Sequence, residues 1–216
     1  MTRDWDLRAD ELSGEAIDNG EPTAWFDRLY AEGVSGQVSM PWDRDQPHPL
    51  LAEWAGGTSL DGRDRSAVVV GCGLGADAEF LAGLGFRTTG FDIAPTAIEQ
   101  AKSRHPSSLV DYRVADLLAL SDDLVGAFDL VVEIFTLQAL PDPPRTAAAA
   151  GVRSLVAPGG RLLAVAFREG ESPAAPGPPF PLTRADMASL ASDGITLVEL
   201  EEAAEERWRA EYRRMH

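Results

Sequence analysis

The sequence is poor in the residues that build disulfides and metal centres. It has one cysteine, Cys72, and three histidines, His48, His105 and His216. A single cysteine excludes an internal disulfide, and none of the histidines has metal-ligand spacing with it. We therefore expect no structural or catalytic metal, and we expect a cytoplasmic location.

Long apolar runs are missing as well. No stretch approaches the roughly 20 consecutive apolar residues that cross a bilayer. The first residues lack the basic and apolar blocks of a secretory signal. We expect no membrane partner.

Basic residues are scarce, with 19 Lys and Arg against 35 Asp and Glu, which leaves a formal net charge of −16. Such a surface repels phosphate backbones, so we expect no nucleic-acid partner. The 216 residues, 44% of them apolar, suffice for one domain with a full hydrophobic core. No exposed apolar patch is evident, which favours a monomer.

The chain divides into two parts near residue 50. Residues 1–50 are polar, rich in tryptophan and weakly periodic, which indicates a helical or irregular segment. In residues 51–216, short apolar runs alternate with helically spaced segments, as in βαβ units that form a parallel sheet. The predicted strands are 67–70, 87–91, 112–115, 128–134, 161–167, 195–200 and 205–214, the predicted helices are 76–84, 96–103, 145–156 and 184–192, and 169–181 is a predicted loop.

A glycine-rich loop leaves the first predicted strand and enters a helix. Gly71, Gly73 and Ala76 satisfy the G-x-G-x-x-G/A spacing of dinucleotide sites. Glycines let the backbone approach a ligand closely, and the helix N-terminus supplies free N–H groups. We interpret Cys72 as a small buried side chain that fills space in this loop. The loop indicates a nucleotide or nucleoside ligand, but a glycine-rich turn without a ligand remains an alternative.

Two acidic residues follow neighbouring predicted strands. Asp92 comes about 20 residues after the loop begins, where a carboxylate accepts hydrogen bonds from ribose hydroxyls. Asp116 ends the third strand, where it could accept from the exocyclic amine of adenine. The plainer interpretations are an N-cap for Asp92 and a solvated loop acid for Asp116. Little chain is left for the second half or substrate domain that a nicotinamide enzyme usually has.

These motifs resemble class I methyltransferases, and more narrowly the thiopurine S-methyltransferase superfamily. The narrower likeness rests on the Trp25-Phe-Asp-Arg-Leu-Tyr30, Pro41-Trp42-Asp43 and Gly177-Pro-Pro-Phe180 motifs. The resemblance implies an α/β Rossmann-like fold whose seven-stranded sheet has the order 3-2-1-4-5-7-6 with strand 7 antiparallel. It also implies S-adenosylmethionine as cofactor. The predicted cofactor contacts are Trp25, Trp42, Gly71, Cys72, Gly73, Ala76, Asp77, Asp92, Ile93, Asp116, Leu117, Glu133 and Ile134.

The weak periodicity of residues 1–50 and the placement of Trp25 and Trp42 suggest that this segment caps the cofactor as a lid over the Rossmann-like domain. Two features depart from the family pattern: the link between Gly33 and Pro41 is long, and Glu133-Ile-Phe-Thr136 lacks the aromatic that plant members often carry there. Without the family resemblance, we would interpret Trp25 and Trp42 as side chains packed in the hydrophobic core.

The predicted function is methyl transfer from S-adenosylmethionine to a small molecule, with a thiol or thiopurine, a halide or a heterocyclic nitrogen as acceptor. No catalytic residue is predicted, because an ionised or soft acceptor needs no protein base. His48 reads as a surface or capping histidine rather than a base. The alternatives are a protein that binds S-adenosylmethionine without catalysis and an NAD(P)-dependent oxidoreductase.

Overall fold

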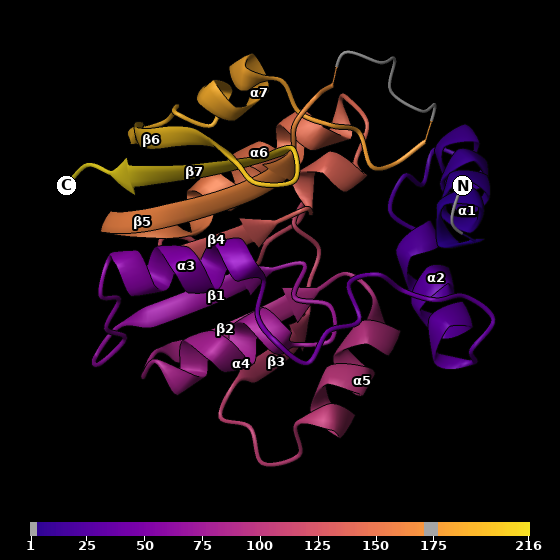
Figure 1. Cartoon of the computed structure of the whole chain (residues 1–216), viewed down its shortest axis with the longest axis horizontal. Helices are drawn as coiled ribbons and strands as arrows, with labels where there is room; N and C mark the ends of the chain where they lie inside the picture. The colour runs from indigo at the N-terminus through magenta and orange to yellow at the C-terminus, as the bar shows by residue number, and fades with distance from the viewer. Residues whose placement is uncertain (1–3, 171–176) are drawn as a thin grey trace.

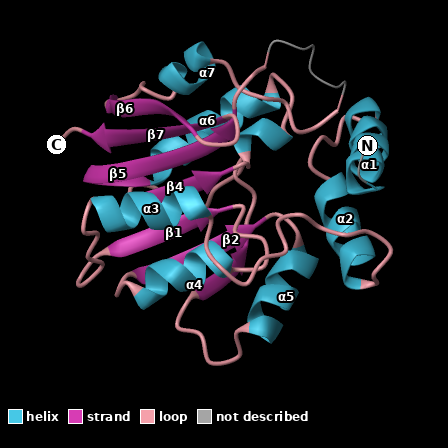
Figure 2. Cartoon of the chain, viewed as in Figure 1, coloured by secondary structure: helices cyan, strands magenta, loops and turns pink. Residues whose placement is uncertain are grey.

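The computed structural model describes residues 4–170 and 177–216, which form one seven-stranded sheet covered by helices on both faces (Figures 1 and 2). The strand order is β3-β2-β1-β4-β5-β7-β6, and β7 runs antiparallel to β5 and β6. The fold class, the strand order and the antiparallel seventh strand predicted from the sequence are confirmed. The strands are β1 (Ser66–Val70), β2 (Arg87–Asp92), β3 (Asp111–Val114), β4 (Phe128–Ile134), β5 (Val156–Phe167), β6 (Ile195–Ala203) and β7 (Arg207–Arg214).

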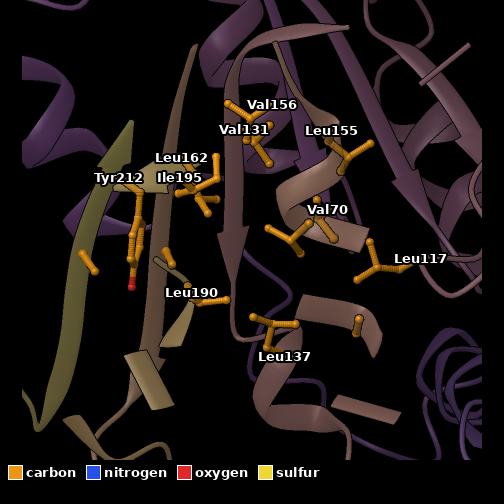
Figure 3. Packing of buried hydrophobic residues seen from close by; sticks show 14 of the residues in the cluster. Val70, Leu117, Val131, Leu137, Leu155, Val156, Leu162, Leu190, Ile195 and Tyr212 are labelled. Atoms are coloured by element: carbon orange, nitrogen blue, oxygen red, sulfur yellow. The ribbon is translucent and has the colours of Figure 1, made fainter. Parts of the chain in front are cut away.

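The two faces of the sheet carry separate hydrophobic clusters because side chains alternate along each strand. In β1, Val68 and Val70 pack on the face covered by α6 and α7, whereas Ala67 and Val69 pack under α3, α4 and α5. Figure 3 shows the first face, where Leu155 of α6 lies over the central strands. The helices are α1 (Asp4–Asp18), α2 (Trp25–Val34), α3 (Pro49–Gly57), α4 (Ala76–Gly83), α5 (Pro95–Arg104), α6 (Pro144–Leu155) and α7 (Arg184–Ser189), with a 3₁₀ turn η1 (Leu137–Ala139).

One predicted boundary is wrong. The sequence places a helix over 145–156, ended by Pro158-Gly159-Gly160, and starts the next strand at Arg161. In the structure α6 ends at Leu155 and β5 begins at once, at Val156. Phe128 pairs with Val156 and Leu130 pairs with Arg161, so the proline-glycine turn is a bulge within the strand.

Other predicted elements lie within a few residues of the observed ones. Helix α7 begins with a capping box, in which the side chains of Thr183 and Asp186 each accept a hydrogen bond from the other's backbone N–H. It ends at Ser189, three residues before the predicted end. The tail is strand β7, with Trp208 and Tyr212 buried as its alternation predicts. The predicted loop at 169–181 falls partly on 171–176, outside the described residues.

The N-terminal segment forms two helices that pack beside the sheet (Figure 1). Leu12 of α1 and Leu29 of α2 share a small cluster, and Tyr30 of α2 packs with Ala97 of α5. The division predicted near residue 50 falls in the first turn of α3, which packs on the sheet through Leu51. Within residues 4–170 and 177–216, no helix is long and apolar enough to cross a membrane.

Candidate active site

A cavity of about 480 Å³ opens at the carboxyl ends of β1, β2 and β4, under the N-terminal helices. Ligands bind at this edge in open α/β sheets because the loops after parallel strands meet there. All the predicted cofactor contacts except Glu133 line the cavity. We call the part formed by residues 71–77, Asp92 and Asp116 the glycine-loop end.

The glycine-loop end begins with a backbone in the left-handed region that favours glycine. Gly71 and Gly73 have φ of 58° and 52°. A Cβ on Gly71 would lie 2.5 Å from Thr136 Oγ1, and one on Gly73 would lie 2.9 Å from Tyr30 Oη. The loop therefore presents bare backbone to the cavity, ahead of the N-terminus of α4 at Ala76.

Asp92 lies at the end of β2 with 6% of its surface exposed. Its Oδ2 accepts a hydrogen bond from the N–H of Gly73 at 3.0 Å, and its Oδ1 accepts from the N–H of Ala94 at 3.0 Å. Burial raises the pKa of Asp92 to about 6 despite these two bonds. A carboxylate accepts about four hydrogen bonds, so each oxygen retains capacity for a ligand hydroxyl. A ribose diol fits this site, because it supplies two donors to a buried anion that lines the cavity.

The other predicted residues of the glycine-loop end complete its walls. Asp116 is half-buried two residues after β3, and its Oδ1 accepts from Leu118 N–H at 2.8 Å. Cys72 is buried and its thiol pKa is raised, first by burial and then by Asp92, which fits a filler rather than a reactive thiol. Ile93, Leu117 and Ile134 add apolar surface.

Asp77 joins the glycine-loop end to the N-terminal segment. Its Oδ1 accepts from the backbone N–H of His48 at 2.6 Å, and its Oδ2 lies 3.7 Å from the guanidinium of Arg44. Burial raises the pKa of Asp77, and the His48 bond and Arg44 oppose that rise. Asp77 therefore holds the loop before α3 against the first turn of α4.

The two predicted tryptophans lie in the cavity wall on the N-terminal side. Trp25 stacks on Phe26 and donates a hydrogen bond from Nε1 to Pro22 O at 3.0 Å. Trp42 makes edge contacts with Trp5 and Tyr30, at 5.5 and 6.0 Å between ring centroids. Tyr30, which we did not predict, lies over Gly73; the helical spacing from Phe26 to Tyr30 was the signal that could have found it.

The opposite part of the cavity, which we call the aromatic end, is lined by His48, Phe135, Phe167 and Arg207. The rings of Phe135 and Phe167 stack at 4.8 Å, and the Arg207 guanidinium carbon lies 3.6 Å from the Phe167 centroid. Phe135 thus supplies an aromatic ring just after β4. The family resemblance had indicated that the aromatic residue of plant members is lacking near this point. Phe167 and Arg207 were not predicted, because the resemblance makes β5 and β7 neighbours without showing which of their side chains line the cavity.

Glu133 lies beneath the aromatic end rather than in the cavity wall. It is 1% exposed, and its Oε1 accepts from the N–H groups of Thr136 and Leu137 at 2.7 and 2.9 Å. Burial raises its pKa to about 7. Its carboxylate shapes the turn that carries Phe135, so the structure does not bring it together with the other predicted contacts.

His48 caps α3, as the sequence interpretation favoured. Its Nδ1 accepts from Leu50 N–H at 3.2 Å. Burial, with Arg44 and Arg207 nearby, lowers the pKa of His48 to about 4, so the ring is neutral at physiological pH. Among the described residues, no group of three or more His, Cys, Asp or Glu side chains is arranged to hold a metal ion.

The fold is the Rossmann-like fold of solved S-adenosylmethionine-dependent methyltransferases. Magnesium protoporphyrin IX methyltransferase of Synechocystis PCC 6803, solved with S-adenosylhomocysteine, has a TM-score of 0.62 at 17% identity, over 98% of this chain and 100% of that one. The 1,6-didemethyltoxoflavin-N1-methyltransferase of Burkholderia thailandensis, also solved with S-adenosylhomocysteine, has a TM-score of 0.67 at 15% identity, over 96% and 91%.

Residues 25–215 match the thiopurine S-methyltransferase family, and the chain belongs to that family. The resemblance seen in the sequence is thereby confirmed. A curated relative, the ubiquinone biosynthesis O-methyltransferase of Xanthomonas euvesicatoria pv. vesicatoria (strain 85-10), is 35% identical over 130 residues, which cover 56% of this chain and 53% of the relative. The chain spans about half the length of the curated relatives it matches.

Proposed function

We propose that the protein transfers a methyl group from S-adenosylmethionine to a small-molecule acceptor. The observation that carries the proposal is the pairing of the glycine loop with the buried Asp92 in a cavity that continues to the aromatic end. Family membership supports the cofactor. The acceptor atom stays open, since the relatives' names include an O-methyltransferase and an N1-methyltransferase.

The proposed division of labour follows from the geometry. S-adenosylmethionine, when bound, supplies a methyl group on a positively charged sulfur. Asp92 holds the ribose, and the backbone at Gly71 and Gly73 allows close approach. Tyr30 and Trp42 cover this end and exclude water. Holding two reactants in line accounts for roughly 7–11 kcal/mol of barrier lowering in such reactions.

We also propose that residues 1–50 act as a lid, with Trp25 and Trp42 among its cofactor contacts. The support is that the N-terminal segment supplies one wall of the cavity and is tied to the domain at Asp77 and at α5, where Asp27 accepts from Thr96 N–H at 2.9 Å. A monomeric state and a cytoplasmic location stay predictions, as does the absence of nucleic-acid and membrane partners.

The test has two stages. First, the melting temperature of the protein is measured with S-adenosylhomocysteine, NAD or NADP to identify the cofactor. A bound ligand at about 100 times its dissociation constant stabilises the folded protein by roughly 2.7 kcal/mol and so raises this temperature. A rise with NADP alone would refute the proposal. Methyl transfer from labelled S-adenosylmethionine is then measured with iodide, bisulfide, thiophenol, catechol and a pyridine. Tight cofactor binding without transfer to any acceptor would favour a binding protein over an enzyme.

A further inference from the structure

The two ring nitrogens of His48 have different surroundings. Nδ1 accepts the hydrogen bond from Leu50 N–H, and a nitrogen that accepts carries no proton. The neutral ring therefore carries its proton on Nε2. Within the described residues the structure gives Nε2 no hydrogen bond, while the ring lines the cavity edge-on to Phe135, with 5.1 Å between centroids.

In this arrangement His48 can donate a hydrogen bond to a ligand, but it cannot act as a base that takes a proton from one. A base would need a lone pair on Nε2, and hence a proton on Nδ1. That proton would point at the N–H of Leu50, and the cap of α3 would be lost. The protonated nitrogen of His48 is thus the one available to a ligand at the aromatic end.

Charged side chains of both signs surround His48. Arg44 lies on the same loop and Arg207 lines the cavity from β7. On the acidic side, Asp77 of α4 is engaged by the His48 backbone and faces Arg44, and Glu205 lies at the cavity rim before β7. Arg44 faces Asp77 and Arg207 lies over the Phe167 ring, so the His48 N–H is the donor that lines the cavity where the acceptor would lie.

The neighbouring rings present a flat surface that the backbone holds in place. Phe135 has a φ of 63°, which is rare for a residue with a side chain. Its N–H donates to Val165 O at 3.0 Å, and the buried Glu133 fixes the two residues that follow. A residue held in a sparsely populated conformation by its surroundings is typical of a binding site.

We propose that His48 binds the methyl acceptor, in its anionic form, as a hydrogen-bond donor through Nε2. This inference rests on the proposed methyl transfer. The charged group of the acceptor accepts the hydrogen bond from His48 Nε2–H, beside Phe135. The acceptor enters already ionised, so no protein group removes a proton.

Two substitutions separate the two nitrogens. Asn places an oxygen where Nδ1 stands, so His48→Asn keeps the helix cap and loses the donor. Gln places an NH₂ group near Nε2, so His48→Gln keeps the donor and loses the cap. The probe is 4-nitrothiophenol, whose thiolate absorbs visible light and thus reports its own ionisation. It is titrated into the protein saturated with S-adenosylhomocysteine, and melting temperatures are recorded in parallel.

The donor role predicts that the wild type binds the probe as its thiolate and lowers the pKa of the probe. His48→Asn should weaken binding about tenfold or more, as loss of a hydrogen bond to a charged group does, and should raise the pKa of the bound probe. His48→Gln should bind nearly as the wild type does, while its melting temperature falls by about 2–4 °C. Where methyl transfer to the probe occurs, kcat/KM should follow the same order.

A purely capping role predicts the reverse order, with His48→Asn equal to the wild type. That result, equal weakening in both variants, or no binding of the probe to the wild-type complex would overturn the inference. Failure of S-adenosylhomocysteine to bind would refute the proposed function instead. The probe titration without cofactor would then still compare the two variants.

Discussion

The two ends of the cavity are built in opposite ways. The glycine-loop end is formed by residues 71–77, Asp92 and Asp116, which are close in the chain, and it meets its ligand with backbone groups and the buried Asp92. The aromatic end collects side chains that are far apart in the chain: His48, Phe135, Phe167 and Arg207. The first end is suited to one fixed ligand, and the second can change with single substitutions while the sheet stays the same.

The difference also shows in what holds each end together. At the glycine-loop end, positive φ values and close approaches leave no room for side chains at Gly71 and Gly73. At the aromatic end, ring stacking and the carboxylate of Glu133 fix the side chains. Substitutions should therefore act on cofactor binding at one end and on acceptor binding or stability at the other.

The largest effect is expected from a side chain in the glycine loop. Gly73→Val should abolish measurable S-adenosylhomocysteine binding and destabilise the fold. A positive φ costs about 1–3 kcal/mol for such a residue, and overpacking against Tyr30 adds about 1–3 kcal/mol. Calorimetric titration and thermal unfolding check both. Gly83→Ala, with nothing within 4 Å of its added Cβ, is the control and should bind normally. Normal binding by Gly73→Val would contradict the assigned loop.

The next effect concerns stability at the aromatic end. The pKa of Glu133 is raised to about 7, so its neutral form is favoured in the folded state. The stability that this provides is full below the unfolded pKa of 4.5 and is lost as pH rises through 7. Glu133→Gln keeps a neutral oxygen for Thr136 and Leu137 and should stabilise the protein by up to about 3 kcal/mol at pH 8.

Denaturant unfolding at pH 4.5 and pH 8 measures this change. The advantage of Glu133→Gln should nearly vanish at pH 4.5, where Glu133 is protonated in the folded state and half-protonated in the unfolded state. The exposed Glu99→Gln serves as the control and should shift stability little at either pH. A destabilised Glu133→Gln at pH 8 would mean that the turn before η1 depends on the charge.

The contrast between the ends explains how much the sequence could predict. The glycine loop and Asp92 follow from local motifs, whereas the sheet order is what the family resemblance implies. Glu133 ends a strand at the correct edge of the sheet, but the sequence could not reveal that its side chain turns inward to bond Thr136 and Leu137. The resemblance implies that strand 7 lies beside strand 5, as observed, but not which of its side chains reaches the cavity, so Arg207 was not predicted.

A third prediction concerns how cofactor binding depends on pH. Burial raises the pKa of Asp92 to about 6, and only the ionised form accepts from both ribose hydroxyls. S-adenosylhomocysteine affinity should therefore hold above pH 6 and fall below it, by about tenfold near pH 5. Titrations from pH 5 to 8 test this. Asp92→Asn should bind weakly at every pH, whereas the exposed Asp122→Asn should behave as the wild type. A flat wild-type profile would refute the role of Asp92.

The smallest effect is expected where the N-terminal segment is tied down at the surface. Arg104 of α5 donates to both carboxylate oxygens of Asp43, at 2.6 and 2.9 Å, and each side chain is about a third exposed. Such an exposed pair contributes about 0.2–1 kcal/mol. Arg104→Gln should therefore loosen only the attachment of the lid, and should weaken S-adenosylhomocysteine binding by less than about fivefold.

Salt separates this ion pair from the buried contacts of the lid. The Debye length falls to about 3 Å at 1 M salt, so the difference between Arg104→Gln and the wild type should disappear there. Asp27→Ala removes the partly buried bond to Thr96 N–H and should keep its effect at high salt. Calorimetric titrations at low and high salt give the comparison. An Arg104→Gln defect that persists at 1 M salt, or that exceeds tenfold, would show that Arg104 does more than fasten the lid.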